Sequence, residues 1–313
     1  AKRMREEYSS LEALIVCRES NNASAHEHLL SEMATRYSLD EARKITRPAA
    51  PGPGDVLAFQ LSGGSTGVPK IIPRMHADYL GAAASWNVRQ QLDKSDIALW
   101  ALPLIHNAGM LCMLVPALIA KRPLVIQSRF NIDDFLTAIE EYQITYTGSI
   151  GPIGTRIIDH PDISRHDLSS LKSMFTLARA EGVERQTGAR TLQMYGITEG
   201  LLMACAPDES AEARHGTMGW PTGVGDEIKL LEPEGLTPVQ TGETGELCFR
   251  SPHMLLAYYN APDATQESFT SDGFFRTGDL VRQKEIDGRT CYIFEGRLKD
   301  NINRGGEKFG AEE

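Results

Sequence analysis

The sequence predicts an α/β fold in which a parallel sheet flanked by helices is followed by a smaller antiparallel β subdomain. From Asp55 to about residue 214, short apolar runs alternate with helical segments, the pattern of strands joined by crossover helices. After that point, short strand-like runs are separated by Gly, Pro and Asp turns. With 313 residues, of which 41% are hydrophobic and 24% charged, the chain has enough apolar material for a globular core.

Residues 1–54 are expected to be the end of a preceding subdomain followed by a Pro/Gly linker. A strand is predicted over residues 11–18, a helix over His26–Tyr37 and the linker over Arg47–Gly54. The α/β part is expected over residues 55–214.

Within the α/β part, Asn131 is expected to cap a helix whose first turn carries Asp133 and Asp134, as the helix dipole favours. Residues 179–190 look too short for a helix with its two connections, which favours a fragment or a chain with missing segments. The other expected elements are helices over His76–Gln91 and Met110–Ala120 and strands over Val56–Leu61, Ile97–Leu102, Leu124–Gln127, Ile144–Thr147, Met174–Ala178 and Leu192–Tyr195.

A β-rich subdomain is expected over residues 215–296. Its strands are predicted over Asp226–Leu231, Glu246–Arg250, Leu280–Gln283 and Cys291–Glu295. Residues 297–313 are expected to form a hinge and the start of a mobile C-terminal domain that these residues do not include.

Composition narrows the classes of partner. The formal net charge of −10 argues against nucleic acid and against an anionic membrane. Ile97–Ala120 is almost wholly apolar, but Pro103 and Pro116 interrupt it, which favours a buried strand, a loop and a buried helix over a membrane span. The five scattered cysteines form no metal-binding pattern and are typical of reduced thiols in a cytoplasmic protein.

The segment Leu61–Lys70 carries the most specific motif. Its glycines let the backbone turn tightly and bring N–H groups onto a phosphate, and its hydroxyls and lysine add donors and positive charge. It is not a Walker loop, because Pro69 precedes the lysine and Ile71 follows it. The segment resembles the phosphate-binding loop of the adenylate-forming ligases. That resemblance implies an ATP-binding loop made of Ser62, Gly63, Gly64, Ser65, Thr66, Gly67 and the catalytic Lys70.

A second motif, Met194–Gly200, follows in the order that this superfamily shows. The resemblance implies that Tyr195 stacks on adenine, that Thr198 lies near the α-phosphate and that Glu199 holds Mg²⁺. An aromatic face suits a purine, and a hard carboxylate suits Mg²⁺. Ala178 is placed on the adenine side by the same comparison. Taken alone, the motif would be an ordinary strand-to-helix connection.

Two later motifs complete the nucleotide site by resemblance. In Phe275–Leu280, which alone would be a common turn, Asp279 is implied to accept hydrogen bonds from both ribose hydroxyls. In residues 296–308, Arg297 is implied to contact the ribose and Lys299 to act as the pivot of the mobile domain. A fifth motif, residues 245–250, is expected to be structural scaffold.

Further details resemble the stand-alone aryl-acid adenylating enzymes of siderophore pathways, namely residues 59–64, 72–79 and 303–308 and the run Pro103–Asn107. There Asn107 is implied to hydrogen-bond the ortho-hydroxyl of an aryl acid and His106 to flank its carboxylate. Gly196 is placed in the same acid pocket. Cys112 and Leu202 lie where 2,3-dihydroxybenzoate enzymes place serine and valine, which favours salicylate.

Departures leave other acids open. Ala108 replaces the usual aromatic residue, Thr198 replaces a small alanine, and residues 177–180 lack the usual paired glycines. A hydroxyanthranilate, a hydroxypicolinate or anthranilate therefore stays an alternative.

The implied reaction has two halves. The aryl carboxylate attacks the α-phosphate of ATP, MgPPi leaves, and the acyl group then passes to the phosphopantetheine thiol of an aryl carrier protein. An aryl-CoA ligase that uses free coenzyme A is the alternative. A non-catalytic nucleotide-binding module is another, although intact Lys70, Glu199, Asp279 and Arg297 argue against it. The superfamily places a second catalytic lysine in the C-terminal domain, so residues 1–313 alone are expected to bind both substrates but adenylate poorly.

Overall fold

The structure, a computed structural model, describes residues 14–16, 27–29, 41, 50–62, 69–233, 235–298, 301–304 and 307–310. The chain divides into two compact units, Ala1–Pro51 and Gly52–Glu313. Each unit is described here by itself.

In the first unit, β1 (Leu14–Val16) pairs in parallel with β2 (Glu27–Leu29). The strand predicted over residues 11–18 is confirmed where it is described. The helix predicted over His26–Tyr37 is wrong at Glu27–Leu29, because these residues bond to a neighbouring strand, and the rest of that prediction lies outside the described residues.

The second unit opens with a hairpin of β3 (Val56–Leu61) and β4 (Ile71–Met75). The sequence placed the first of these in the parallel series, and that placement is wrong. β3 and β4 are joined by the glycine-rich segment, which is too short for the helical crossover that a parallel pair requires and therefore favours antiparallel pairing. At its base, the Ser62 backbone N donates to Lys70 O and the Lys70 backbone N donates to Ser62 Oγ, both at 2.9 Å.

The main sheet has seven strands in the order β11-β10-β9-β8-β7-β5-β6, of which β6, β5, β7, β8 and β9 run parallel. β10 pairs antiparallel with both β9 and β11, so the predicted parallel sheet is confirmed with an antiparallel edge. The strands are β5 (Ala98–Trp100), β6 (Leu124–Ile126), β7 (Tyr146–Ser149), β8 (Ser173–Thr176), β9 (Arg190–Gly196), β10 (Leu202–Ala204) and β11 (Trp220–Pro221).

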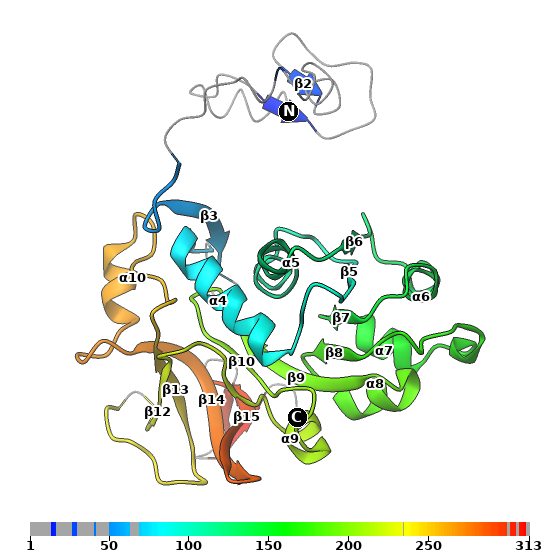
Figure 1. The fold of residues 1–313 in the computed structure, drawn as a ribbon. Helices are drawn as coiled ribbons and strands as arrows, with labels where there is room; N and C mark the ends of the chain where they lie inside the picture. The colour runs from blue at the N-terminus through cyan, green and yellow to red at the C-terminus, as the bar shows by residue number, and fades with distance from the viewer. Residues whose placement is uncertain are drawn as a thin grey trace. The chain divides into compact units, whose positions relative to one another are not determined.

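Helices cover both faces of this sheet (Figure 1). One core joins α4 (His76–Arg89), the π-helix η1 (Gly109–Leu114) and α5 (Val115–Ala120) to the side of the sheet that carries Phe175. The other joins α6, α7 and α8 to the side that carries Met174. These two residues are neighbours in β8, so the alternation of side chains along a strand separates the two cores. The remaining bounds are α6 (Ile132–Glu141), α7 (Ile153–Ile158), η2 (Ile163–Arg165) and α8 (Ala180–Thr187).

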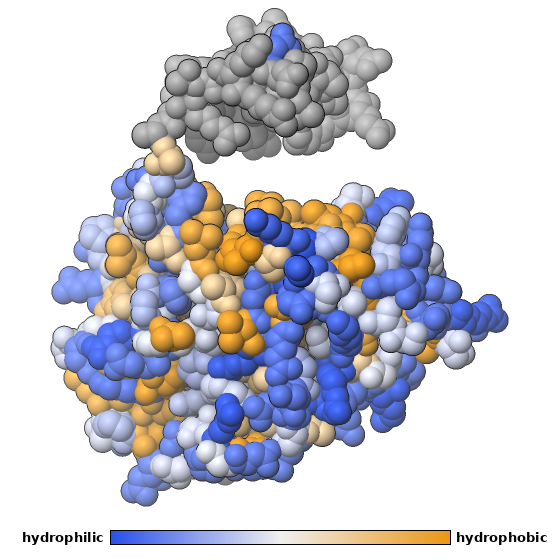
Figure 2. Space-filling view, in the orientation of Figure 1, coloured by the Kyte–Doolittle hydropathy of each residue, from blue (hydrophilic) through white to orange (hydrophobic). Residues whose placement is uncertain are grey.

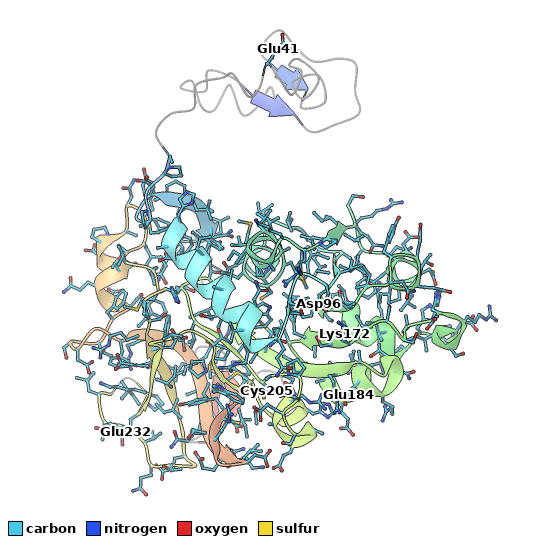
Figure 3. The ribbon with its side chains drawn as sticks, viewed as in Figure 1. Glu41, Asp96, Lys172, Glu184, Cys205 and Glu232 are labelled. Carbon is cyan, nitrogen blue, oxygen red and sulfur yellow. The ribbon has the colours of Figure 1, made fainter. Side chains whose placement is uncertain are left out.

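Residues 179–190, expected to be too short for a helix, hold α8, and that expectation is wrong. Arg179 and Gly188 both take left-handed backbone conformations, at φ 60° and 73°, which reverse the chain within one residue at each end. Glu184 of α8 points toward α9 (Ala211–Gly216) and binds Arg214 there (Figure 3).

The predicted antiparallel β unit is confirmed as a four-stranded sheet in the order β12-β13-β14-β15. It packs its apolar face, including Phe249 and Phe275, against Tyr195 and Met203 of the main sheet. The bounds are β12 (Glu227–Leu231), β13 (Thr244–Arg250), α10 (Pro262–Glu267), β14 (Phe275–Ile286) and β15 (Arg289–Arg297), followed by the hairpin of β16 (Asn301–Arg304) and β17 (Glu307–Gly310).

The apolar run Ile97–Ala120 forms β5, a turn, η1 and α5, which confirms the strand, loop and helix predicted for it. Among the described residues, no helix combines the length and apolarity that a membrane crossing requires. Polar side chains cover much of the face seen in Figure 2, and apolar ones gather near the part that carries β3 and α5.

Candidate active site

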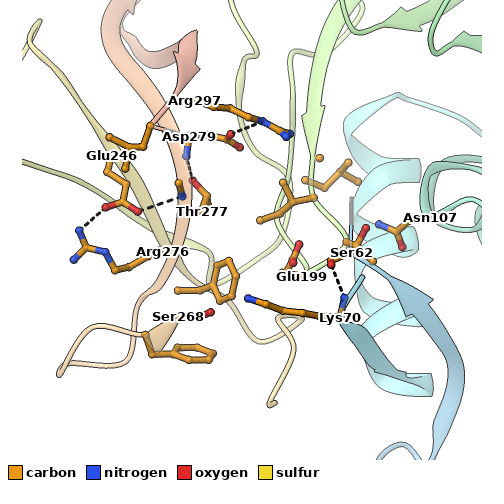
Figure 4. Close-up of a pocket in the computed structure, with 18 of the residues that line it drawn as sticks. Ser62, Lys70, Asn107, Glu199, Glu246, Ser268, Arg276, Thr277, Asp279 and Arg297 are labelled. Atoms are coloured by element: carbon orange, nitrogen blue, oxygen red, sulfur yellow. Dashed lines mark hydrogen bonds and ion pairs between the residues drawn. The ribbon is translucent and has the colours of Figure 1, made fainter. Parts of the chain in front are cut away.

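A cleft of about 1210 Å³ lies between the main sheet and the four-stranded sheet (Figure 4). It brings together residues that are more than two hundred positions apart in the sequence. The predicted site residues that line it are Ser62, Lys70, His106, Asn107, Cys112, Gly196, Thr198, Glu199, Leu202, Asp279 and Arg297.

Two predicted residues do not line this cleft. The Tyr195 side chain is buried at 8% exposure behind the cleft wall, and Ala178 is exposed next to the end of β8. Gly63, Gly64, Ser65, Thr66, Gly67 and Lys299 lie outside the described residues.

The turn that carries Thr198 and Glu199 joins β9 to β10 as a hairpin, not as the strand-to-helix connection that the motif alone would form. A buried cation holds it, because Arg74 on β4 donates from Nη1 to Thr198 O and from Nη2 to His253 O at 2.8 Å. Gly200 sits at φ 129°, and a Cβ there would lie 2.5 Å from His253 O. The position therefore requires glycine.

Tyr258 connects Glu199 to Lys70. Its hydroxyl donates to Glu199 Oε1 at 2.9 Å, and Lys70 Nζ lies 4.5 Å from the centre of its ring. Burial, together with the neighbouring Glu199 charge, raises the pKa of Tyr258, so the hydroxyl keeps its proton and remains a donor. One phenol thus holds a cation over its face and an anion at its edge.

The segment carrying Asp279 is a bulge inside β14 and not the free turn that the sequence indicated. Arg276 pairs with Cys248 and Leu280 with Glu246, so three residues of β14 lie opposite one residue of β13. Gly278, at φ 73°, permits this geometry, and Asp279 is turned to the cleft.

Glu246 fixes the bulge from the neighbouring strand. This carboxylate is 3% exposed, binds the Arg276 guanidinium and accepts a bond from Gly278 N at 3.2 Å (Figure 4). Thr277 Oγ1 donates to Leu247 O at 2.8 Å on the same strand. These contacts agree with the scaffold role predicted for the motif around Glu246.

Asp279 is held from both sides. The buried Tyr195 hydroxyl donates to Asp279 Oδ2 at 2.6 Å, and Arg297 Nε lies 3.1 Å from Oδ1. Asp279 and Arg297 are direct cross-strand partners, so the register of β14 and β15 creates this pair. Burial first, and then the charge of Asp279, raises the pKa of Tyr195 and keeps its hydroxyl protonated.

The opposite end of the cleft is built by the turn before η1. His106 Nδ1 accepts from Ala108 N at 3.2 Å, which leaves Nε2 as the protonated nitrogen of the neutral ring. Partial burial lowers the pKa of His106, so the neutral form is favoured. Asn107 follows at the cleft wall, where its Oδ1 accepts from the Tyr79 hydroxyl at 3.1 Å.

Cys112 and Leu202 form the apolar part of this end and are 0% and 4% exposed. Burial raises the pKa of the Cys112 thiol far above its usual value, so the group acts as a small uncharged surface. The four cysteines in the described part of the chain are free and buried.

Sequence reasoning gave no role to Tyr79, Arg74 or Tyr258, which position the predicted residues. Tyr79 and Arg74 stood within the segment 72–79 that carried the family resemblance, so a weak signal existed for them. The sequence held no such signal for Tyr258, because a Tyr-Tyr-Asn run before a helix is common.

Comparisons with known proteins agree with this geometry. A family model described as AMP-binding enzyme matches residues 4–259. Pyochelin synthase PchD of Pseudomonas aeruginosa is 35% identical over 91% of this chain and 52% of its own length. The 2,3-dihydroxybenzoate-AMP ligase of Bacillus subtilis is 37% identical over 83% of this chain and 49% of its own.

Among solved structures, MbtA of Mycobacterium smegmatis superposes with a TM-score of 0.83 at 28% identity, over 99% of this chain and 57% of that one. The chain spans about half the length of the curated relatives it matches. These matches and the cleft together confirm the family predicted from the sequence: the chain belongs to the AMP-binding enzymes.

Proposed function

We propose that this cleft binds ATP and an ortho-hydroxy aryl acid and forms the aryl-adenylate, with salicylate favoured and 2,3-dihydroxybenzoate next. One observation carries the proposal. The groups that we assign to the nucleotide, including Glu199 and Asp279, and those that we assign to the acid, including Asn107 and Cys112, line a single cleft. Adenylation requires both substrates in one space, with the carboxylate aligned on the α-phosphate.

On the nucleotide side, Asp279 is the proposed ribose acceptor. Oδ2 accepts from Tyr195 and Oδ1 lies beside Arg297, and an ionised carboxylate offers about four lone-pair sites for hydrogen bonds. Because Tyr195 and Arg297 fix both oxygens, the carboxylate is oriented before the nucleotide arrives. In this proposal Tyr195 acts mainly through Asp279, since its ring lies behind the cleft wall.

The residues present fit a phosphate chain with Mg²⁺. Tyr258 donates to Oε1 of Glu199 and orients this carboxylate, which would hold Mg²⁺. When bound, Mg²⁺ neutralises charge on the phosphates. Lys70 and Ser62, at the base of the glycine-rich segment, line the same cleft, and we assign them to the phosphate oxygens.

In the reaction, the acid carboxylate attacks the α-phosphate and pyrophosphate leaves with its electron pair. The protein's task is alignment and charge stabilisation, which we assign to Lys70, Thr198 and the neutral His106 beside the carboxylate. A neutral imidazole donor at this point does not add a proton to the attacking carboxylate.

The acceptor in the second half-reaction is proposed to be the phosphopantetheine thiol of an aryl carrier protein. Free coenzyme A is the alternative. Incubating the full-length protein with ATP and salicylate, and then with a phosphopantetheinylated carrier domain or with coenzyme A, distinguishes them by which thioester forms.

The adenylation step is tested by ATP–pyrophosphate exchange with Glu199→Gln. Replacing the metal-binding carboxylate by a neutral amide is expected to lower kcat/KM for ATP at least about 100-fold, which corresponds to about 3 kcal/mol. Glu181→Gln, an exposed carboxylate on α8, is the matched control and is expected to exchange at the wild-type rate. Exchange that survives Glu199→Gln would contradict the proposal.

A further inference from the structure

The hydrogen-bond direction at Asn107 is set by a short relay of three side chains. Gln60 Nε2 donates to the backbone oxygen of Ile105 at 3.1 Å. A backbone carbonyl can only accept, so this bond fixes which end of the Gln60 amide is the NH₂ group. The same side chain also interacts with the Tyr79 hydroxyl, and this interaction opposes the rise in pKa that burial causes in that phenol.

Tyr79 passes this direction on to Asn107. Its side chain is 0% exposed, and burial raises the pKa of Tyr79, so the hydroxyl keeps its single proton. The hydroxyl gives that proton to Asn107 Oδ1, 3.1 Å away, and the Gln60 side chain is its other polar neighbour. The amide oxygen of Asn107 is thereby occupied, and its NH₂ group is left for the cleft.

Asn107 lines the cleft, and its side chain is directed into it (Figure 4). Among the residues that the structure describes, no acceptor is hydrogen-bonded to Nδ2 of Asn107. A polar donor that faces a partly enclosed site without a partner favours a ligand that supplies an acceptor.

We infer that Tyr79 and Gln60 are specificity-determining positioning residues that make Asn107 a donor, so that the site selects acids whose ortho substituent accepts a hydrogen bond. This inference rests on the proposed function. In salicylate the hydroxyl proton is held by the neighbouring carboxylate, and the hydroxyl oxygen is free to accept from Asn107. In anthranilate the ortho nitrogen presents two N–H donors and a lone pair delocalised into the ring, so two donors would face each other. The relay therefore selects against anthranilate and other aryl acids with an ortho amino group, which the sequence alone left open.

The test measures ATP–pyrophosphate exchange on the full-length protein with salicylate, anthranilate and benzoate for the wild type and for Tyr79→Phe. Without the Tyr79 hydroxyl, either end of the Asn107 amide can face the cleft. The ratio of kcat/KM for salicylate over anthranilate is expected to fall about tenfold. Because this is a ratio within one variant, a general loss of stability or activity cancels.

Tyr146→Phe is the matched control. Tyr146 is also 0% exposed and belongs to the same apolar core, but its hydroxyl accepts from Trp86 Nε1 at 2.8 Å and does not contact Asn107. Its salicylate-over-anthranilate ratio is expected to equal that of the wild type. Gln60→Leu, which removes the first member of the relay, is expected to lower the ratio by a smaller amount and serves if Tyr79→Phe does not fold.

The outcomes separate the two claims. Salicylate exchange with ratios that stay within about twofold across Tyr79→Phe and Gln60→Leu would overturn the relay and leave the proposed function standing. A wild-type protein that prefers anthranilate would overturn the relay as well. Exchange with none of the three acids would overturn the proposed function, and the relay with it.

Discussion

At the residue scale, several groups expected to touch substrates are each positioned by one hydrogen-bonding neighbour. Tyr258 holds Glu199, Arg74 holds the turn that carries Glu199, and Tyr79 holds Asn107. The two supporting tyrosines are buried, and burial raises the pKa of each, so both hydroxyls keep their proton at neutral pH. Preorganisation of this kind removes reorganisation from the reaction itself.

Tyr258→Phe tests the link between Glu199 and Lys70. The substitution keeps the ring under Lys70 but removes a hydrogen bond to a carboxylate, a contact that contributes about 1.5–3 kcal/mol. We expect the Mg²⁺ concentration needed for half-maximal exchange to rise about tenfold. Tyr259→Phe, at the exposed neighbouring position, is the control. An unchanged Mg²⁺ requirement in Tyr258→Phe would show that the link has no function.

Cys112→Ser tests the apolar end of the cleft. A serine hydroxyl offers a hydrogen-bond partner to a second ring hydroxyl, where the buried thiol offers almost none. We expect kcat/KM for 2,3-dihydroxybenzoate relative to salicylate to rise about fivefold to tenfold in exchange assays. Equal relative use of the two acids before and after the change would remove Cys112 from the selectivity argument.

Local motifs predicted much of the site, and their limits are physical. Lys70, Asn107, Glu199 and Asp279 were predicted from their own short segments, and all of them line the cleft. The position of Tyr195 behind the wall was not predictable, because it depends on how the second sheet packs against β9.

At the element scale, the junction between α8 and α9 rests on Glu184. Burial disfavours the charged carboxylate, but hydrogen bonds from the Arg214 guanidinium, the Thr191 backbone N–H and His215 outweigh it and lower the pKa of Glu184 to about 2. The Arg214 side chain is fully buried, so Glu184 is the counter-charge for a guanidinium that water does not reach.

The stability that Glu184 contributes depends on pH with a definite sign. Its pKa is lower in the folded state, so the contribution is fully present above about pH 5 and is lost as pH falls toward 2. We expect Glu184→Gln to lower the free energy of unfolding by about 2–3 kcal/mol at pH 7 and by clearly less at pH 3. Urea unfolding at both pH values measures this, with the exposed Glu181→Gln as control. A penalty equal at the two pH values would contradict the assignment.

Periodicity predicted the parallel strands and the helices α4, α5 and α6, because each buries its own apolar face, but it indicated no helix at α7, α9 or α10. Two other predictions were wrong for different reasons: the placing of β3 in the parallel series, and the argument from length that residues 179–190 could not hold a helix. The partner of β3 lies beyond a glycine-rich segment, so its direction is set by tertiary pairing. The connections of α8 are short because two left-handed residues reverse the chain at its ends.

At the scale of the whole molecule, the cleft exists because two sheets with different strand arrangements pack through one apolar layer. The main sheet contributes the turn with Glu199, and β14 and β15 contribute Asp279 and Arg297. The wall that we propose binds the acid comes from η1 and the turn before it. Neither sheet alone carries both halves of the proposed site.

The most direct test of the central claim is ATP–pyrophosphate exchange by the full-length protein with salicylate, 2,3-dihydroxybenzoate, benzoate and 3-hydroxyanthranilate compared side by side. The account predicts exchange with salicylate at least about tenfold above benzoate, because only the hydroxy acid satisfies the donor of Asn107. Exchange with none of the four acids, or with benzoate as well as with salicylate, would contradict it.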